Sequence, residues 1–527
     1  MSSRVIIAEP FASRGQDVLH ERGIDVVSCV GLSRDDLLAA LGDADGLIVR
    51  SETRVDRDLL SHAPRMRVVG RAGVGVDAID VDAATEAGIV VVNTPAANTI
   101  AATEQTFALL LALMRHVAPA NASIRAGRWE RAPFIGNELY GKTLGVIGLG
   151  RIGGGVATRA RAFGMEVIAH DPYVPQARAE TLQLELESFE RLLQRADVVT
   201  LHVPLTQQTR SMIDARALSR MKPSAILLNC ARGGVVDEEA LIAALDGEKI
   251  RAAAIDVVAQ EPPAPDSPGA KLQRHPKVLA TPHLGGSTYE ALERIAVELA
   301  QDVADALGGR PAAGAVNAPA PTGADAQRVR AFVEVADRLG RLMPQLFTDA
   351  LRLPLRMHLA GEIAGVNAEP LRAAFFAALL QSTTERRVSI VNALQIAEEI
   401  GVVLEIVPEP NPPAYASLLS IWAGPHRLAA TILSGGARVV QIDAYELDAI
   451  PQGFWIVTRH QDVPGMVGRI GTILGEAGVN ISTMQVARDP GSGEALMVLA
   501  IDRAPSRMHL DAMRAIAGMR QVDAAVF

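Results

Sequence analysis

Short apolar runs recur along the chain and are separated by stretches of helical length. The first five cover residues 5–8, 25–27, 46–49, 68–70 and 89–92, and six more cover residues 143–147, 166–169, 197–201, 225–229, 252–256 and 278–280. Continuous apolar runs of this length are typical of strands that are buried on both faces of a parallel sheet. The pattern therefore predicts a series of βα units, and the last six runs predict a complete Rossmann sheet.

Helical periodicity predicts two longer helices on either side of these six runs. One passes through residues 103–115, and the other extends from about residue 289 to residue 307. A stretch rich in Ala, Pro and Gly then continues to about residue 326 and is predicted to be a linker. Residues 327–450 have mixed periodicity, and from about residue 454 the order of elements is β, α, β, β, α, β, which is typical of a ferredoxin-like fold.

Composition limits the class of protein. The chain has 527 residues, of which 49% are hydrophobic and only 4% aromatic, so its interior consists mainly of aliphatic side chains. This length suggests roughly three or four domains. The formal net charge is −9 without a concentrated basic block, which argues against nucleic acid or an anionic membrane as the main partner.

The expected compartment is the cytoplasm. Two cysteines, Cys29 and Cys230, are too few for a disulfide framework, and the first residues lack the pattern of a signal peptide. The longest apolar run of helical type, residues 107–114, is far shorter than a membrane span. We predict no metal site.

A glycine-rich loop follows the sixth apolar run. Gly148, Gly150 and Gly153 have the spacing at which the first glycine allows a tight turn, the second allows backbone to approach a pyrophosphate, and the third allows close packing of helix and strand. The N-terminus of the following helix attracts the diphosphate. Asp171 lies at the expected distance downstream for a carboxylate that binds the ribose 2′-hydroxyl, so the sequence predicts NAD in preference to NADP.

Three polar residues that follow later strands match the needs of 2-hydroxy acid oxidation. Arg232 offers a bidentate fork to a substrate carboxylate, and His283 is suited to accept the hydroxyl proton. Glu261 is suited to orient that histidine and to stabilise its protonated form. Taken singly, each residue also has an ordinary structural explanation, as a surface arginine, a capping glutamate or a core histidine.

Together these segments resemble the D-isomer-specific 2-hydroxyacid dehydrogenases. The resemblance covers roughly residues 4–310 and depends on residues 148–153, 228–238 and 282–288. It implies that Arg232, Glu261 and His283 are catalytic and that Asp256 lies near the nicotinamide. The cofactor-binding residues that motif and resemblance together predict are Gly148, Gly150, Arg151, Ile152, Gly153, Asp171, Cys230, Ala231, Arg232, Asp256, His283, Gly285 and Gly286.

Within this family, residues 49–51, 70–77 and 129–131 look like those of members that oxidise D-3-phosphoglycerate. By similarity, Arg50, with its neighbour Ser51, and Arg71 bind the phosphate. The backbone of Ala72, Gly73, Val74 and Gly75, together with Asn98, holds the carboxylate end, and Arg131 reaches in from a neighbouring subunit. Another 2-hydroxy acid, such as glycerate or glyoxylate, stays open as an alternative substrate, as does an NAD-sensing regulator without catalytic activity.

The last unit resembles an ACT domain, a small-ligand sensor of amino-acid enzymes. His460, Asp462 and Asn480 are suited to bind a free amino acid across a subunit interface, and the resemblance implies L-serine as the effector. The alternative is a unit that serves only for dimerisation. Residues 389–401 resemble the allosteric substrate-binding domain of long family members, although Leu394 and Ile400 replace the usual Pro and Arg.

The predicted architecture is α/β. A Rossmann nucleotide-binding domain is inserted in a flavodoxin-like substrate domain, and an α+β intervening domain and a ferredoxin-like ACT domain follow. The predicted limits are residues 1–97 with 287–315 for the substrate domain, 98–286 for the NAD domain, 316–450 for the intervening domain and 453–527 for the ACT domain. The expected assembly is a homodimer or homotetramer.

Overall fold

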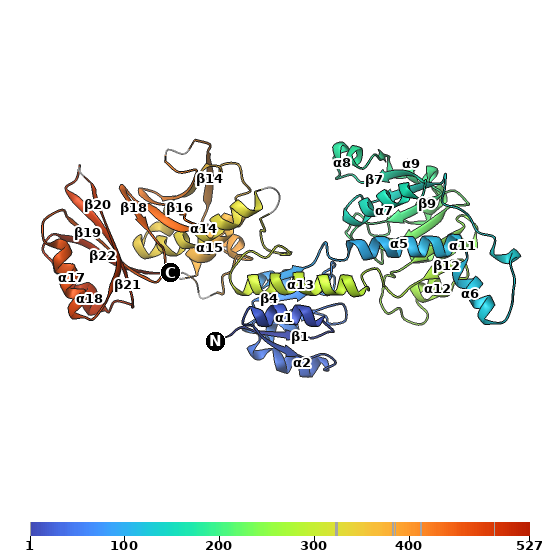
Figure 1. Cartoon of the computed structure of the whole chain (residues 1–527), viewed down its shortest axis with the longest axis horizontal. Coiled ribbons are helices and arrows are strands. Elements are labelled where there is room, and N and C mark those ends of the chain that lie inside the picture. Colours follow the sequence, from blue (N-terminus) through green and yellow to red (C-terminus); the bar gives the residue numbers. More distant parts are fainter. Residues whose placement is uncertain (1, 322–324, 382–383, 385, 412–413, 490) are drawn as a thin grey trace.

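The computed structural model describes residues 2–321, 325–381, 384, 386–411, 414–489 and 491–527, so residues 322–324 of the predicted linker lie outside the described residues. In this part of the chain the strands form four sheets. Figure 1 shows the second sheet at one end of the molecule and the fourth at the other, with the first and third between them.

The first sheet is parallel and has the order β2-β1-β3-β4-β5. Its strands are β1 (Arg4–Ile7), β2 (Asp25–Ser28), β3 (Gly46–Val49), β4 (Val68–Arg71) and β5 (Val90–Asn93), and its helices are α1 (Ser13–Glu21), α2 (Arg34–Ala40), α3 (Arg57–Ser61) and α4 (Val81–Glu86). This strand order is that of flavodoxin-like folds. Helix α13 (Tyr289–Leu307) returns from the second unit and covers the sheet beside α1, with Leu299 and Val303 fully buried.

The second sheet has seven parallel strands in the order β12-β11-β10-β9-β6-β7-β8. The strands are β6 (Thr143–Ile147), β7 (Glu166–His170), β8 (Glu185–Leu186), β9 (Val198–Leu201), β10 (Ile226–Asn229), β11 (Ala252–Ile255) and β12 (Val278–Ala280). The order contains the six-stranded Rossmann arrangement with β12 added at one edge. The sequence did not predict β8, because a two-residue edge strand has no apolar run of its own.

Helices cover both faces of the second sheet (Figure 1). They are α5 (Thr99–Met114), α6 (Val117–Arg125), α7 (Arg151–Ala162), α8 (Gln176–Thr181), α9 (Phe189–Arg195), α10 (Ala215–Arg220), α11 (Glu238–Asp246) and α12 (Pro268–Arg274). Helix α5 begins four residues before its predicted start and packs on α7, where Phe107 stacks on Phe163 at 5.4 Å between ring centroids. The chain enters this unit through α5 and leaves it through α13, so the unit is inserted in the first.

The predicted linker is not free along its whole length. After α13, Ala315 bridges to Val92 of β5, and the Asn317 side chain accepts a hydrogen bond from the Val91 N–H at 2.8 Å. The unpaired edge of β5 explains this docking, because its backbone amides need acceptors. Residues 314–317 therefore pack on β5, and the linker prediction was wrong for residues 316 and 317, which lie beyond the predicted limit of the substrate domain.

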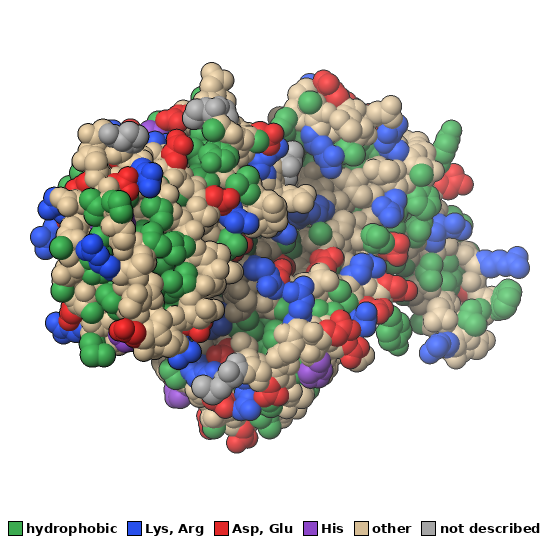
Figure 2. All heavy atoms as spheres, turned by 60° about the vertical axis from the view of Figure 1, so that its left-hand side comes forward, with side chains coloured by type: hydrophobic (Ala, Val, Ile, Leu, Met, Phe, Trp, Pro, Cys, Tyr) green, Lys and Arg blue, Asp and Glu red, His purple; other side chains and the backbone are tan. Residues whose placement is uncertain are grey.

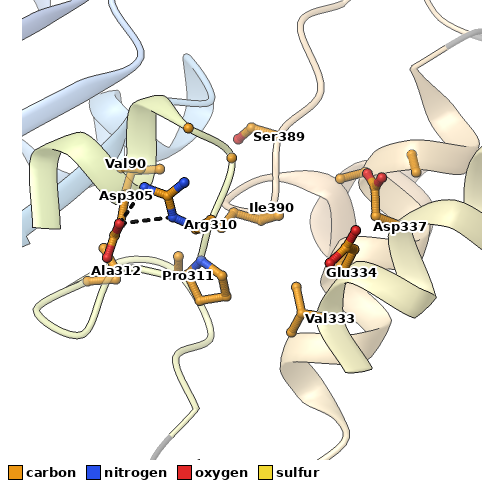
Figure 3. Close-up of a pocket in the computed structure, with 18 of the residues that line it drawn as sticks. Val90, Asp305, Arg310, Pro311, Ala312, Val333, Glu334, Asp337, Ser389 and Ile390 are labelled. Carbon is orange, nitrogen blue, oxygen red and sulfur yellow. Dashed lines mark hydrogen bonds and ion pairs between the residues drawn. The ribbon is translucent and has the colours of Figure 1, made fainter. Parts of the chain in front are cut away.

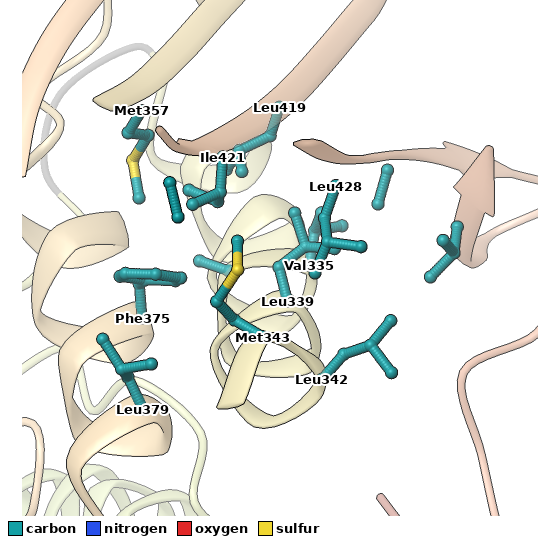
Figure 4. Close-up of a cluster of buried hydrophobic side chains, with 14 of the residues drawn as sticks. Val335, Leu339, Leu342, Met343, Met357, Phe375, Leu379, Leu419, Ile421 and Leu428 are labelled. Carbon is teal, nitrogen blue, oxygen red and sulfur yellow. The ribbon is translucent and has the colours of Figure 1, made fainter. Parts of the chain in front are cut away.

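The third sheet is mixed and has the order β14-β13-β15-β16-β17-β18. Its elements are α14 (Ala326–Leu346), β13 (Leu355–Gly361), α15 (Glu369–Leu380), α16 (Ala393–Glu399), β14 (Leu404–Glu409), β15 (Ser417–Ala423), β16 (His426–Leu433), β17 (Gly436–Ile442) and β18 (Tyr445–Ala449). Figure 4 shows Val335, Leu339 and Met343 of α14 directed between the strands and α15. This apolar stripe of α14 anchors the unit.

The fourth sheet is antiparallel and has the order β20-β21-β19-β22. Its elements are β19 (Phe454–Gln461), α17 (Met466–Glu476), β20 (Ile481–Asp489), β21 (Glu494–Ile501), α18 (Arg507–Arg514) and β22 (Met519–Val526), which is the predicted order. Trp455 is fully buried and joins the core of the third unit. The side chain of Gln345 exchanges hydrogen bonds with the backbone of Val526 at 2.8 and 3.0 Å, so α14 holds the edge of β22.

Among the described residues, no single helix is long and apolar enough to cross a membrane. Helices α5 and α6 together have the length and apolar composition of a span, but the chain bends by 62° between them.

Candidate active site

A cleft of about 700 Å³ lies where the carboxyl ends of strands from the first two sheets meet. Its walls include Arg50, Arg71 and Asn98 from the first unit and its boundary, and Glu261 and His283 from the second. Ligands of open parallel sheets bind at this end of the strands. Figure 2 shows that the surface is hollowed between the lobes of the molecule, with both basic and acidic side chains around the hollow.

The glycine loop has the geometry that the motif predicts. Gly148 has a φ of +90°, and a Cβ at Gly153 would lie 2.0 Å from the Gly148 carbonyl oxygen. A Cβ at Gly150 would meet no atom within 4 Å, so the loop faces open space at that point. Helix α7 begins directly after Gly150. These residues therefore fit a dinucleotide whose diphosphate approaches the backbone at the N-terminus of α7.

Asp171 follows β7 and supports the same loop. One of its carboxylate oxygens accepts the N–H of Leu149 at 2.8 Å, and the other accepts the N–H of Tyr173 at 2.9 Å. A carboxylate has about four acceptor positions, so both oxygens keep capacity for a ribose hydroxyl. The loop and Asp171 are therefore one hydrogen-bonded unit, and the preference for NAD at this position stays a prediction.

His283 and Glu261 form a hydrogen-bonded pair at the mouth of the cleft. The His283 Nδ1 atom lies 2.6 Å from a Glu261 carboxylate oxygen, and the other oxygen accepts the Val258 N–H at 3.1 Å. Burial opposes the ionisation of Glu261, but the interactions with His283 and Val258 outweigh it and hold the pKa of Glu261 below its ordinary value. An ionised Glu261 accepts a hydrogen bond from the Nδ1–H group, which leaves Nε2 as the unprotonated nitrogen of the neutral imidazole.

Asp256 determines the position of His283. Its buried carboxylate accepts the Thr281 hydroxyl at 2.5 Å and the N–H groups of Leu284 and Gly285 at 2.8 and 2.7 Å. His283 itself has a φ of +53°, and its N–H donates to the carbonyls of Asp256 and Thr281 at 2.8 and 3.0 Å. This left-handed conformation is costly outside glycine, so the surrounding hydrogen bonds must impose it. Asp256 therefore contacts the loop; its predicted cofactor contact stays a prediction.

Arg232 crosses the cleft toward the first unit. Its Nε atom lies 3.5 Å from a carboxylate oxygen of Asp77, and its Nη1 atom donates to the Ala231 carbonyl at 2.7 Å. A Cβ at Gly75 would lie 2.5 Å from Arg232 Nη2, so the guanidinium rests against the backbone of the predicted substrate loop. The predicted substrate-binding backbone and the predicted catalytic arginine are thus adjacent.

Three guanidinium groups concentrate positive charge around this loop. Burial is the largest cause that lowers the pKa of Arg71, and the positive charges of Arg232 and Arg50 add to it. The carboxylates of Asp77 and Glu9 act in the opposite direction, and the resulting pKa of Arg71 is about 10. Arg71 remains protonated at neutral pH. A cluster of cations that is only partly offset by carboxylates favours a multiply charged anion.

The structure brings together most of the predicted residues. Asn98, whose buried Oδ1 has no partner among the described residues, lines the cleft with Ser51, Ala72, Gly73 and Gly286. Cys230 and Ala231 are buried beside the end of β10, and burial raises the pKa of the Cys230 thiol to about 12. Arg151 and Ile152 open helix α7.

Arg131 was predicted to reach in from a neighbouring subunit, and this stays a prediction. It is exposed on the segment after α6 and, in the described chain, does not line the cleft. The sequence interpretation also missed Glu9, which binds the loop that carries Arg50. A carboxylate at the end of the first strand was the available signal.

The predicted effector residues do not meet within one chain. His460 is almost completely buried, and its Nδ1 atom lies 2.9 Å from the carbonyl of Gln461. Asp462 pairs with Arg488 at 3.1 Å. Asn480 precedes Ile481, which pairs with Ile501 at one end of the sheet, whereas His460 pairs with Ala495 at the other end. Six residues of strand separate these ends, or about 20 Å at about 3.4 Å per residue.

A second cavity of about 740 Å³ lies between the first and third units. Figure 3 shows the Asp305–Arg310 ion pair on one wall and Glu334 and Asp337 of α14 on the opposite wall. None of the described residues that line it belongs to the predicted active site.

Known protein families match the second, third and fourth units of the chain. Residues 107–285 match the NAD-binding domain of the D-isomer-specific 2-hydroxyacid dehydrogenases. Residues 328–443 match the intervening domain of D-3-phosphoglycerate dehydrogenase, and residues 454–518 match the ACT domain.

Relatives extend this similarity to nearly the whole length. D-3-phosphoglycerate dehydrogenase of Archaeoglobus fulgidus is 37% identical over 98% of this chain and 98% of its own length. The enzyme of Mycobacterium leprae is 42% identical over 95% of this chain and 94% of its own. The chain belongs to the D-3-phosphoglycerate dehydrogenase family. The predicted family, fold class and NAD-binding domain of this family member are confirmed.

Solved structures cover somewhat more than half of this family member. The TT0316 protein of Thermus thermophilus is 39% identical, covers 59% of this chain and 99% of its own, and has a TM-score of 0.55. D-lactate dehydrogenase of Aquifex aeolicus, in complex with NAD and lactic acid, is 29% identical, covers 58% of this chain and 96% of its own, and has a TM-score of 0.52.

We expect Gly153→Ala to weaken NADH binding by at least about tenfold, because an added methyl group would displace the Gly148 carbonyl and open the loop. The matched control is Gly154→Ala, whose Cβ would meet its nearest atom, on Leu182, at 3.7 Å. Titration of NADH fluorescence measures both affinities. Equal affinities in the two variants would contradict the role of Gly153.

Proposed function

We propose that this protein oxidises D-3-phosphoglycerate to 3-phosphohydroxypyruvate with NAD, the first step of L-serine biosynthesis. The observation that carries this proposal is the convergence of Arg50 and Arg71 with the His283–Glu261 pair in one cleft. Two guanidinium groups are suited to a phosphate, and Arg232 beside the loop of residues 72–75 is suited to a carboxylate. The family membership of the full-length relatives supports the same substrate.

The residues divide the reaction among them. The hydroxyl proton of the substrate passes to His283 Nε2, because Nδ1 is engaged by Glu261. Glu261 stabilises the imidazolium that forms, and Arg232 holds the carboxylate and polarises the neighbouring oxygen. As the C2–H bond breaks and the carbonyl forms, NAD supplies the acceptor for the hydride. The glycine loop, Asp171 and the start of α7 would hold that cofactor.

The C-terminal unit supports regulation by L-serine in an oligomer. Because Asn480 and Asp462 lie at opposite ends of the fourth sheet, a site that uses both needs two chains.

The segment that carries Arg131 exposes three large apolar side chains. They are Trp129, Ile135 and Tyr140, which are 78%, 77% and 79% exposed. Large apolar side chains gathered on one exposed segment favour burial against another copy, as a dimer or tetramer.

Two free buried cysteines support a location in the cytoplasm.

The substrate is tested by NADH formation at 340 nm with D-3-phosphoglycerate and with unphosphorylated D-glycerate. We expect the phosphorylated acid to be strongly preferred, and Arg71→Ala to raise its KM by about 10²-fold, since a charge-assisted contact contributes about 1.5–3 kcal/mol. The control is Arg57→Ala, an exposed arginine that pairs with Glu86. Equal turnover of both acids by the wild-type protein would refute phosphate recognition.

Glu261→Gln tests the proton path. Because the pKa of Glu261 is held below its ordinary value, the carboxylate is fully ionised at any pH well above that ordinary value. Its effect on His283 is lost only when the pH falls through the lower pKa of the folded protein. At neutral pH the neutral Gln variant should lose about 10²-fold in kcat, because the imidazolium is no longer stabilised. The acid limb of its kcat/KM profile should also move to lower pH. An unchanged profile would exclude Glu261 from the proton path.

Mixed oligomers test the effector site. We expect Asp462→Ala and Asn480→Ala each to abolish inhibition by L-serine without loss of turnover. When the two variants are mixed and reassembled, inhibition should return in part, because one of the two sites in a mixed dimer combines intact residues. Inhibition curves of the separate and mixed proteins measure this effect. No recovery on mixing would contradict a site shared between chains.

A further inference from the structure

A buried carboxylate lies directly beneath the phosphate side of the cleft. Glu9 follows β1, and only 6% of the residue is exposed. Its Oε1 atom accepts the N–H groups of Arg50 and Thr53 at 2.8 and 2.9 Å, and its Oε2 atom accepts those of Ser51 and Glu52 at 2.9 and 3.1 Å. Four consecutive residues of the loop after β3 thus turn their amides toward one side chain.

The number of donors explains why a carboxylate stands here. Four N–H groups need four acceptor positions, which two carboxylate oxygens supply, whereas a side-chain amide has one acceptor oxygen and would turn its own N–H groups toward donors. Burial opposes ionisation of Glu9, but the four N–H donors outweigh it and hold the pKa of Glu9 below its ordinary value. The loop is an anion-binding nest whose anion belongs to the protein itself.

Because Glu9 binds the backbone amides of residues 50–53, substrate recognition on this side of the cleft depends on side chains. Since the backbone N–H groups of residues 50–53 point at Glu9, they do not point into the cleft, and contact with an anion there falls to the side chains. Arg50 and Ser51 both line the cleft. The position from which these side chains reach the substrate is fixed by the loop backbone, and the loop backbone is fixed by Glu9.

We propose that Glu9 is a positioning residue for the phosphate side of the active site, which acts through the loop of residues 50–53 to place Arg50 and Ser51. Glu9 does not touch the substrate. Its charge also acts on Arg71, where it partly offsets the positive neighbours Arg232 and Arg50. This inference rests on the proposed function, because it assigns a phosphate to that side of the cleft.

Glu9→Gln is the first test. It leaves two backbone N–H groups facing an NH₂ group, so the loop must shift. We expect KM for D-3-phosphoglycerate to rise by at least about tenfold, because a displacement of about 1 Å can cost about 10²-fold, with kcat changed by less than about threefold. NADH affinity should be unchanged. The control is Glu21→Gln, an exposed carboxylate of the same unit that lies 3.8 Å from Arg14, and its kinetics should equal those of the wild type.

A double-mutant cycle with Arg50→Ala separates positioning from a general loss of structure. If Glu9 acts through Arg50, the Glu9→Gln change should raise KM by less than about twofold once Arg50 is absent. If Glu9→Gln only destabilised the protein, it would raise KM by the same factor in the wild-type protein and in the Arg50→Ala variant. Additive effects would overturn the proposal.

Hydrogen exchange provides a readout that does not depend on the substrate. In Glu9→Gln the amides of residues 50–53 should lose protection, whereas in Glu21→Gln they should keep it. Unchanged protection would overturn this inference even if the enzyme is active; wild-type protein without activity on D-3-phosphoglycerate would overturn the proposed function instead. Should Glu9→Gln fail to fold, Glu9→Asp, which keeps the charge but retracts both oxygens, replaces it in the cycle and in the exchange experiment.

Discussion

The active site depends on carboxylates that accept hydrogen bonds from backbone N–H groups of loops at the ends of strands. Glu9 holds the loop of residues 50–53, Asp171 holds the glycine loop at Leu149, and Asp256 holds the loop that carries His283. Asp302 of α13 does the same for Ala313 and Gly314 where the chain returns to the first sheet. A charged acceptor roughly doubles the strength of such a bond, so each carboxylate fixes a loop that sheet pairing leaves free.

These loops matter because the two parallel sheets each end at the same cleft. The inserted second unit brings Arg232 and His283 against the first unit, where Arg71 and the backbone at Gly75 already lie. Neither unit alone holds both the charge cluster and the His283–Glu261 pair. Insertion of one unit in the other, through α5 and α13, therefore creates the site.

The C-terminal half follows a different principle. Helix α14 places one apolar stripe on the third sheet (Figure 4). It also reaches the edge of β22, and the third and fourth units share a core that includes Trp455. The fourth sheet separates Asp462 from Asn480 along its strands. A ligand site that needs both residues is incomplete in one chain, so the proposed regulation requires an oligomer.

The sequence by itself determined the local elements of this protein. Strand β6, helix α13 and the order of elements in the last unit agree with the predictions because apolar runs, helical periodicity and glycine spacing are local properties of the chain. Tertiary structure alone decided that Glu9 binds residues 50–53, that residues 314–317 pack on β5, and that Asn480 lies far from His460. Each of these depends on which strands become neighbours, and long-range pairing leaves no periodic signal in the sequence.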